Sequence, residues 1–194
     1  MNIEPVTLAG QRVRLEPLVL SHLDALCEVA LNTDIFRWYT HPIRSRDDMR
    51  GFIETALQWQ VDGTAVPFAT VERASGRAIG STRYMNIDKP NRRVEIGATW
   101  VAPAWQRTAV NTEAKYLMLR HAFETLGCIR VELKTDALNE QSRNAILRIG
   151  AREEGIFRNH MICADGRLRN SVYFSIIDSE WPRVKASLEE KLAK

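Results

Sequence analysis

The most informative stretch of the chain reads Glu95-Ile96-Gly97-Ala98-Thr99-Trp100-Val101-Ala102-Pro103-Ala104-Trp105-Gln106-Arg107-Thr108-Ala109-Val110-Asn111-Thr112-Glu113. It predicts a strand that ends near Val101, a short connection, and a helix from about Asn111 to Leu126. Such a connection leaves backbone N–H groups of the loop and of the first helical turn without partners. Together with the helix dipole, these groups form a site suited to a phosphate or a pyrophosphate.

Side chains of the same connection could strengthen the binding of an anion. Arg107 supplies positive charge, and Thr108, Asn111 and Thr112 supply hydrogen-bond donors. The competing interpretation is structural: Pro103 forms a turn, Thr112 caps the helix, and nothing is bound. The stretch lacks the glycines and the lysine of a P-loop, so a nucleoside triphosphate site of that type is not expected.

On both sides of this stretch, alternating and helical patterns of apolar residues predict further elements. Strands are expected at 12–18, 67–72, 78–86, 93–101, 128–135, 154–160 and 171–177. Helices are expected after the caps Ser21 and Asn139, from about Ser45, and from Trp181 onward. A meander of strands followed by alternating strands and helices indicates a mixed α/β fold. We therefore expect one domain over residues 1–194, with a central twisted mixed sheet and helices on both faces.

Composition narrows the class of protein. The chain has 194 residues and a formal net charge of +3, which is too small to indicate binding of nucleic acid. Its three cysteines have no zinc or redox spacing, and its four histidines have no metal-ligand spacing. No signal peptide and no membrane-spanning run is visible. We expect a cytoplasmic protein without a metal site, bound neither to nucleic acid nor to a membrane.

The segment 106–111 resembles the acetyl-CoA pyrophosphate loop of the GNAT superfamily of N-acetyltransferases. It is most similar to the Rim-type branch, the enzymes that acetylate N-termini of ribosomal proteins, in which Thr-Glu-Ala follows as it does at 112–114. The resemblance covers nearly the whole chain. It includes Arg12-Val13-Arg14-Leu15-Glu16-Pro17-Leu18, Asn139-Glu140-Gln141-Ser142, Ile149-Gly150-Ala151 and Glu180-Trp181.

This resemblance implies a GNAT-like fold and acetyl-CoA as co-substrate. The residues implied in cofactor binding are Val101, Gln106, Arg107, Thr108, Ala109, Val110, Asn111, Thr112 and Asn139. Two of them depart from the family pattern, because Ala109 replaces a glycine and Asn111 replaces glycine or alanine. Alanine is strained at positive φ, so we expect Ala109 to have an ordinary helical conformation.

The resemblance also implies two catalytic residues. Glu95 is the candidate base for the amine proton, and the alternative is an exposed strand residue paired with Arg92 or Arg93. Ser142 is the candidate donor to the departing thiolate, and the alternative is a residue that caps the short helix. Asn139 has two interpretations of its own, as a helix N-cap or as a cofactor contact.

The connection between the first two helices, which lines the acceptor site in related enzymes, contains Trp38 and Tyr39. We expect one of these aromatic side chains to anchor the core and the pair to line the substrate site. The expected reaction is transfer of an acetyl group to a primary amine, with a protein or peptide N-terminus as the leading acceptor. The alternatives are acetylation of a small-molecule amine and a non-catalytic sensor of acyl-CoA. The sequence leaves a homodimer open.

Overall fold

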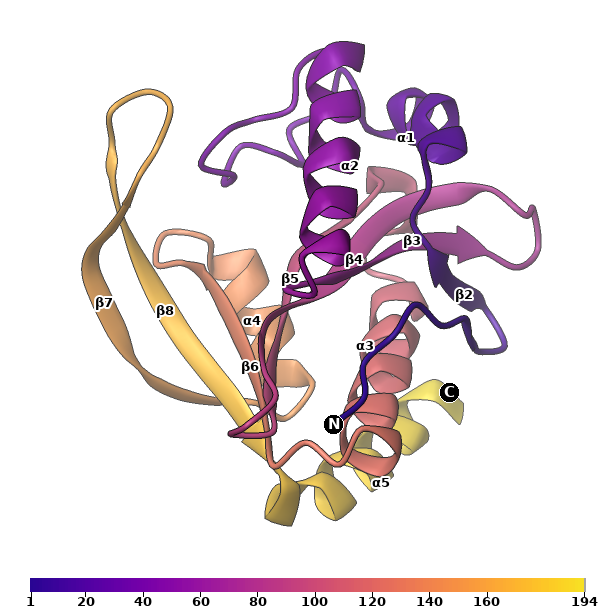
Figure 1. The fold of residues 1–194 in the computed structure, drawn as a ribbon, viewed down its shortest axis with the longest axis vertical. Helices are drawn as coiled ribbons and strands as arrows, with labels where there is room; N and C mark the ends of the chain where they lie inside the picture. The colour runs from indigo at the N-terminus through magenta and orange to yellow at the C-terminus, as the bar shows by residue number, and fades with distance from the viewer. Residues whose placement is uncertain (194) are drawn as a thin grey trace.

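The computed structural model describes residues 1–193, which form one eight-stranded sheet with helices on both faces (Figure 1). The strand order is β1-β2-β3-β4-β5-β6-β8-β7, and β5 and β6 are the one parallel pair among the described strands. The strands are β1 (Leu8–Ala9), β2 (Val13–Pro17), β3 (Val66–Glu72), β4 (Ala78–Asp88), β5 (Arg93–Val101), β6 (Arg130–Asp136), β7 (Arg152–Ile162) and β8 (Leu168–Ile177).

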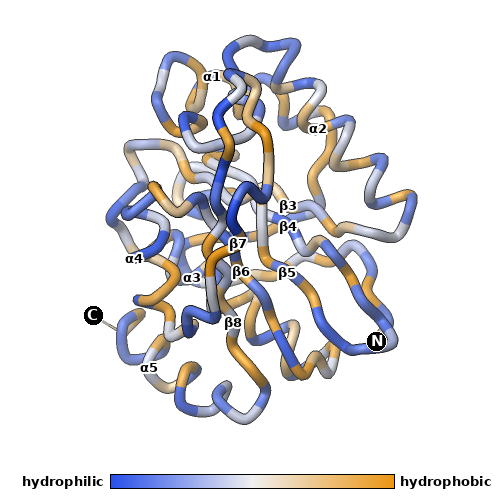
Figure 2. Tube along the Cα trace, turned by 90° about the vertical axis from the view of Figure 1, so that its left-hand side faces the viewer, coloured by the Kyte–Doolittle hydropathy of each residue, from blue (hydrophilic) through white to orange (hydrophobic). Residues whose placement is uncertain are grey.

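The sheet divides the core into two layers, and helices cover both of its faces. They are α1 (Leu23–Ala30), α2 (Arg46–Val61), α3 (Val110–Arg120), α4 (Glu140–Arg148) and α5 (Trp181–Ala193). One cluster of buried side chains joins α1 and α2 to one face of the sheet, and a second joins α3, α4 and α5 to the other face. In Figure 2, α2 and α5 alternate between hydrophobic and hydrophilic residues, as helices with one face on a sheet do.

Local sequence explains where α2 begins and how it packs. Ser45 lies in an extended conformation, and its hydroxyl accepts a hydrogen bond from the backbone N–H of Asp48. The Asp48 carboxylate in turn accepts one from the N–H of Ser45, which completes a capping box. Met49, Ile53 and Ala56 then fall at helical spacing and are buried against the sheet. The predicted start of this helix at Ser45 is confirmed, with Ser45 as its N-cap.

The fold class expected from the sequence is confirmed. Two local predictions are wrong, and one short strand was not predicted. Ser21 does not cap α1, because the chain already enters a 3-10 turn at Leu20 and the N-cap of α1 is His22. The helix expected to reach Leu126 ends as α3 at Arg120 and continues as a π-helical turn. The two-residue strand β1 was not predicted, because so short a segment has no readable alternation.

The feature of the fold that positions the site is a splay between β5 and β6. Their parallel register ends at Glu95 opposite Glu132. Beyond this point β5 continues along β4 to Val101, while β6 continues along β8 to Asp136. Two parallel strands that separate in the middle of a sheet leave backbone groups on their facing edges without ladder partners. Such an opening can bind an extended ligand by backbone hydrogen bonds.

Candidate active site

A bulge in β5 lies just past the start of the splay. Arg83 pairs with Gly97 and Ser81 pairs with Trp100, so Ala98 and Thr99 together face one residue of β4. Ala98 has φ of 46°, which is in the left-handed region and uncommon for a residue with a side chain. A bulge takes its extra residue out of the ladder and frees a backbone N–H to point elsewhere. The bulge therefore supplies a fixed donor next to the opening between the strands.

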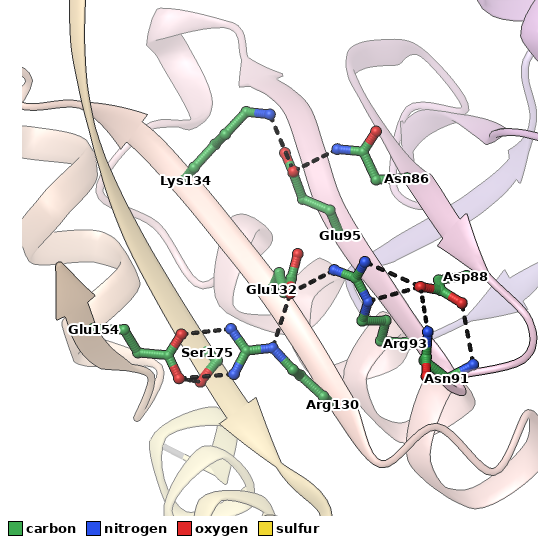
Figure 3. Close-up of polar contacts among 10 residues, drawn as sticks. All are labelled: Asn86, Asp88, Asn91, Arg93, Glu95, Arg130, Glu132, Lys134, Glu154 and Ser175. Atoms are coloured by element: carbon green, nitrogen blue, oxygen red, sulfur yellow. Dashed lines mark hydrogen bonds and ion pairs between the residues drawn. The ribbon is translucent and has the colours of Figure 1, made fainter. Parts of the chain in front are cut away.

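Glu95 is the last residue of β5 that pairs with β6, and it is buried, with 1% of its surface exposed. Its Oε2 accepts hydrogen bonds from Asn86 Nδ2 at 2.8 Å and from Lys134 Nζ at 3.1 Å (Figure 3). Arg93 instead pairs with Asp88 and Glu132. The alternative of an exposed strand residue held by a neighbouring arginine is therefore wrong for Glu95.

The side chains of Glu95 and Met85 pack directly over Gly97. A Cβ built on Gly97 would lie 2.9 Å from Glu95 Oε1 and 2.5 Å from Met85 Sδ. Any larger residue would require Met85 or Glu95 to shift, since both distances are below normal contact. The glycine of the Glu-Ile-Gly segment thus allows the Glu95 oxygen that lacks the Asn86 and Lys134 contacts to lie over the strand.

Glu95 also borders a cleft of about 860 Å³. The cleft lies between the turn after β4 and the strands β6, β7 and β8, and it is rich in charged side chains. A chain of ion pairs crosses its floor, from Glu154 through Arg130, Glu132 and Arg93 to Asp88 (Figure 3).

Hydrogen bonding to Arg130 lowers the pKa of Glu154 to about 2, and hydrogen bonds from Asn91 lower the pKa of Asp88. These two carboxylates stay ionised at neutral pH and already accept donors, so they are poor proton acceptors.

The connection from β5 to α3 presents the other half of the site. Ala109 is the N-cap of α3 with φ of −72°, so the prediction of an ordinary helical conformation is confirmed. The strained position of this loop is Arg107, whose φ is 61°. The N-cap residue Ala109 has no side chain that can cap α3. The Thr108 hydroxyl oxygen accepts a hydrogen bond from the N–H of Val110 at 3.3 Å, which leaves the N–H groups of Asn111 and Thr112 without a side-chain partner within residues 1–193.

Asn111 adds a second sign of an unfilled polar site in this first turn of α3. Its Oδ1 is buried and has no hydrogen-bond partner within residues 1–193. A helix N-terminus beside an exposed arginine fits a phosphate-bearing ligand. The Asn111 oxygen accepts hydrogen bonds, so it fits a donor group and not the phosphate itself.

Several side chains of the loop have partners within the protein. Gln106 donates to the carbonyl of Val101 at 3.0 Å and accepts from Gln141 at 3.3 Å, so it bridges the end of β5 and α4. Thr108 donates to the carbonyl of Trp105 at 2.7 Å. Val110 is buried in the core.

The hydroxyl of Thr112 accepts from Arg148 at 2.8 Å, and Thr112 lies inside α3, two positions after its first residue. Thr112 therefore does not cap the helix.

At the start of α4, the structure assigns the cap to Asn139. Its Oδ1 accepts a hydrogen bond from the backbone N–H of Ser142 at 3.0 Å. The N-cap interpretation of Asn139 is confirmed, and its side-chain NH₂ group remains available to a ligand. Ser142 does not cap the helix, and its half-buried hydroxyl has no hydrogen-bond partner within the described residues.

Trp38 and Tyr39 lie in the connection between α1 and α2. Tyr39 packs edge-to-face on Phe36 of the α1–α2 core, whereas Trp38 lies between the guanidinium groups of Arg37 and Arg167. One aromatic side chain is therefore a core anchor, as expected. The same connection touches the tip of the β7–β8 hairpin, because Ala164 donates to the carbonyl of Thr40 at 2.8 Å (Figure 1).

Sequence reasoning missed the partners of Glu95. Lys134 comes from β6 and Asn86 from β4, and neither is near Glu95 in the sequence. It also missed Arg83, which is 2% exposed in β4. A signal existed for Arg83, since it is a charged residue in the middle of β4, where the neighbouring residues 78–82 and 84–87 are uncharged.

Within the described part of the chain, no helix is long and apolar enough to cross a membrane. Residues 1–193 also contain no cluster of three or more His, Cys, Asp or Glu side chains arranged to hold a metal ion.

Comparison with known proteins identifies the family. Residues 12–152 match the model of the acetyltransferase (GNAT) domain. A GCN5-related N-acetyltransferase from Brucella melitensis is 34% identical and superposes with a TM-score of 0.89, over 97% of this chain and 86% of that chain.

Two further proteins resemble this chain in sequence or in fold. YdaF of Bacillus subtilis, provisionally named a ribosomal N-acetyltransferase, is 34% identical over 55% of this chain and 57% of its own. RimJ of Mycobacterium smegmatis, solved in complex with CoA-disulfide, has the same fold, with a TM-score of 0.82 and 21% identity over 96% of this chain and 95% of its own. The splayed strands, the bulge and the free helix N-terminus thus occur in an enzyme that belongs to the GNAT family of N-acetyltransferases.

Proposed function

We propose that this enzyme transfers the acetyl group of acetyl-CoA to a primary amine, and that the amine is the N-terminus of a protein or peptide. The observation that carries the proposal is the place of Glu95. It is buried where β5 and β6 separate, and it borders the charged cleft. A carboxylate at this junction can reach an amine that enters from the cleft.

The residues of the β5–α3 connection would hold the pyrophosphate of the co-substrate. The N–H groups of Asn111 and Thr112 are first-turn donors of α3, and Arg107 adds an exposed positive charge. The edge of β5 up to Val101 would pair with the pantetheine arm. Asn139 could contribute its side-chain NH₂ group from the start of α4.

The chemistry divides among three groups. Glu95 takes a proton from the amine nitrogen, which must be neutral to attack the thioester carbonyl. The backbone N–H freed by the bulge at Ala98 donates to the carbonyl oxygen as its negative charge grows. A new N–C bond forms and the C–S bond breaks. Ser142 donates a hydrogen bond to the departing sulfur, which ends the reaction as the thiol of CoA.

Two observations support a peptide acceptor. The cleft beside Glu95, at about 860 Å³, lies at the large end of the range for small-molecule pockets. A relative, YdaF, carries the name of a ribosomal N-acetyltransferase. Charged side chains along the cleft suit the polar backbone of a peptide.

The test is acetyl transfer from acetyl-CoA to a panel of peptides and small amines, with thiol release and mass spectrometry as readouts. Acetylation at the α-amine of peptides is the expected result. Acetylation of small amines alone would show that the acceptor is a small molecule and not a peptide. Binding of acetyl-CoA by calorimetry without thiol release for any amine would indicate a sensor. Absence of acetyl-CoA binding would overturn the proposal.

A further inference from the structure

Arg83 is a buried charge without a counter-ion. The residue lies in the middle of β4, is 2% exposed, and points under α2. Its guanidinium carbon lies 4.6 Å from the ring centre of Phe52 and 5.4 Å from that of Trp59. Its Nε and Nη2 are fully covered and have no hydrogen-bond partner in residues 1–193. No ion pair to Arg83 is found there either.

An unpaired buried guanidinium lowers the stability of the folded protein. Removing a guanidinium from water without pairing it costs several kcal/mol, and buried polar groups in proteins are nearly always paired. Burial lowers the pKa of Arg83 to about 10, so the side chain remains protonated at neutral pH. A protein tolerates an unpaired buried charge mainly where a ligand completes the site.

Tyr39, which lies beside Arg83, also has a buried polar group without a hydrogen-bond partner. Its hydroxyl is buried and has no partner within residues 1–193. Both side chains pack on Phe52, since the Tyr39 ring centre lies 6.5 Å from that of Phe52. Burial raises the pKa of Tyr39, and the positive charges of Arg83 and Arg169 oppose this rise. Two neighbouring groups that can both donate, and that lack acceptors, call for an oxygen acceptor between them.

Neighbouring charges leave the region with an excess of positive charge. Lys134 pairs with Glu95, while Arg167 and Arg169 both approach the single carboxylate of Asp136, at 2.7 and 3.8 Å. Asp136 can neutralise only one of the two arginines, and Arg83 adds a further positive charge. An incoming anion would be attracted to this surface.

The site lies next to Glu95. Arg83 pairs across the β4–β5 ladder with Gly97, and Met85 pairs with Glu95. Residues two positions apart on a strand share a face, so Arg83 lies diagonally across from Glu95 at about 7–8 Å between backbones. Gly97 has no side chain of its own, and the Met85 side chain packs over it on the same face. A group bound at Arg83 therefore lies within a few bonds of an amine at Glu95.

We infer that Arg83 and Tyr39 bind an anionic oxygen group of the acceptor, a carboxylate or a phosphate close to the reacting amine. This inference rests on the proposed function, and it gives the acceptor a chemical class: amines that carry a negative charge near the nitrogen. In a peptide the group is the side chain of an acidic residue at the first or second position. In a small molecule it is the carboxylate of an amino acid.

The test compares acceptors that differ only in this charge. Tripeptide amides with glutamate or glutamine at the first or second residue form one arm, and alanine with alaninamide forms the other. The wild-type enzyme should prefer the charged acceptor by about ten- to a hundredfold in kcat/KM, as expected for a lost charge-assisted pair. Arg83→Met should remove the preference through KM and leave the neutral acceptors unchanged. Tyr39→Phe should weaken it severalfold.

Arg50→Met is the matched control, since it removes the same charge from the exposed side of α2, where Arg50 pairs weakly with Glu54 at 3.8 Å. It should retain the preference. Equal rates for charged and neutral acceptors in the wild type, or equal losses for both in Arg83→Met, would overturn the inference.

A binding experiment separates this inference from the proposed function. Calorimetry of the same tripeptide amides with the CoA-bound protein measures charge preference without turnover. Preferential binding of the glutamate peptides that Arg83→Met abolishes supports the anion site even if no amine is acetylated. Equal binding of the glutamate and glutamine peptides overturns it even if acetylation is observed. If Arg83→Met does not fold, Arg83→Lys, which keeps the charge, replaces it in the binding experiment.

Discussion

At the proposed cofactor end of the site, the groups available to a ligand belong mainly to the backbone, whereas at the proposed acceptor end they are charged side chains. The N-terminus of α3 has no side-chain cap, and the bulge of β5 leaves its donors free. Around Glu95, side chains from β4 and β6 form direct charged contacts, and the cleft beyond also draws on β7 and β8.

The difference follows from what each end must recognise. We propose an acyl-CoA as the co-substrate, and backbone N–H groups can bind its phosphates with many different side chains above them. The acceptor varies among functions grafted on one fold, so its site is made by side chains that can change independently. Substitutions at the two ends should therefore have different effects, and the following predictions test that contrast.

The largest effect is expected for Glu95→Gln at the acceptor end. Loss of a general base lowers turnover by about a hundred- to ten-thousandfold. The loss should be greatest at low pH, where more of the amine is protonated, and the affinity for acetyl-CoA should stay unchanged. Pre-steady-state rates against pH and calorimetry check both points. Glu153→Gln, on the exposed side of β7, is the matched control. Wild-type activity of Glu95→Gln at every pH would leave water as the base.

The second effect concerns stability on the α3 face. Lys115 is fully buried there, and its Nζ donates to Thr99 at 2.6 Å. Burial lowers the pKa of Lys115 from 10.5 to about 7. Between these values the unfolded chain binds the proton and the folded protein does not, so stability increases as pH rises from 7 to 10.5.

Lys115→Met should therefore stabilise the protein, by up to about 5 kcal/mol at pH 7 and by only about 2 kcal/mol at pH 9. Urea unfolding of both proteins at the two pH values measures the difference. A gain that does not depend on pH would show that Lys115 is already neutral or hydrated in the folded state. A destabilised variant would show that its hydrogen bond to Thr99 outweighs the burial of charge.

A third prediction separates catalysis from capping in α4. Ser142→Ala should lower kcat about ten- to a hundredfold, because a bond to a developing thiolate is lost. It should leave the melting temperature nearly unchanged, because Asn139 is the cap. Asn139→Ala should instead lower stability by about 1 kcal/mol. Measuring kcat and the melting temperature on both variants decides the roles, and a fully active Ser142→Ala would remove Ser142 from the mechanism.

The smallest effect is expected at the cofactor end. Arg107 is exposed and has no partner within the described residues, so it adds only screened charge to the backbone donors. Arg107→Ala should weaken acetyl-CoA binding about three- to tenfold at low ionic strength and less at high ionic strength. Arg107→Lys should retain most of the affinity. A complete loss of binding would mean that side-chain charge, and not the backbone, dominates this end.

The order and type of nearly all elements could be predicted because they depend on local patterns. The alternation in 93–101 and the capping box at Ser45 are complete within a few residues of sequence. The cofactor loop was equally readable, since a strand, a short connection and a helix start are contiguous. The environment of Glu95 was not, because Lys134 is 39 residues away and Asn86 contributes from a different strand.

The sequence by itself determined the mixed fold, the family and the position of the helix N-terminus that we propose for phosphate binding, because each of these is set by short-range periodicity or by one contiguous motif. Only the tertiary structure decided that Glu95 is buried, that Asn139 rather than Ser142 caps α4, and that Arg83 lacks a partner. Burial and pairing depend on which distant strands meet, and the register of a sheet is fixed by the packing of both its faces. No local pattern of residues carries that information.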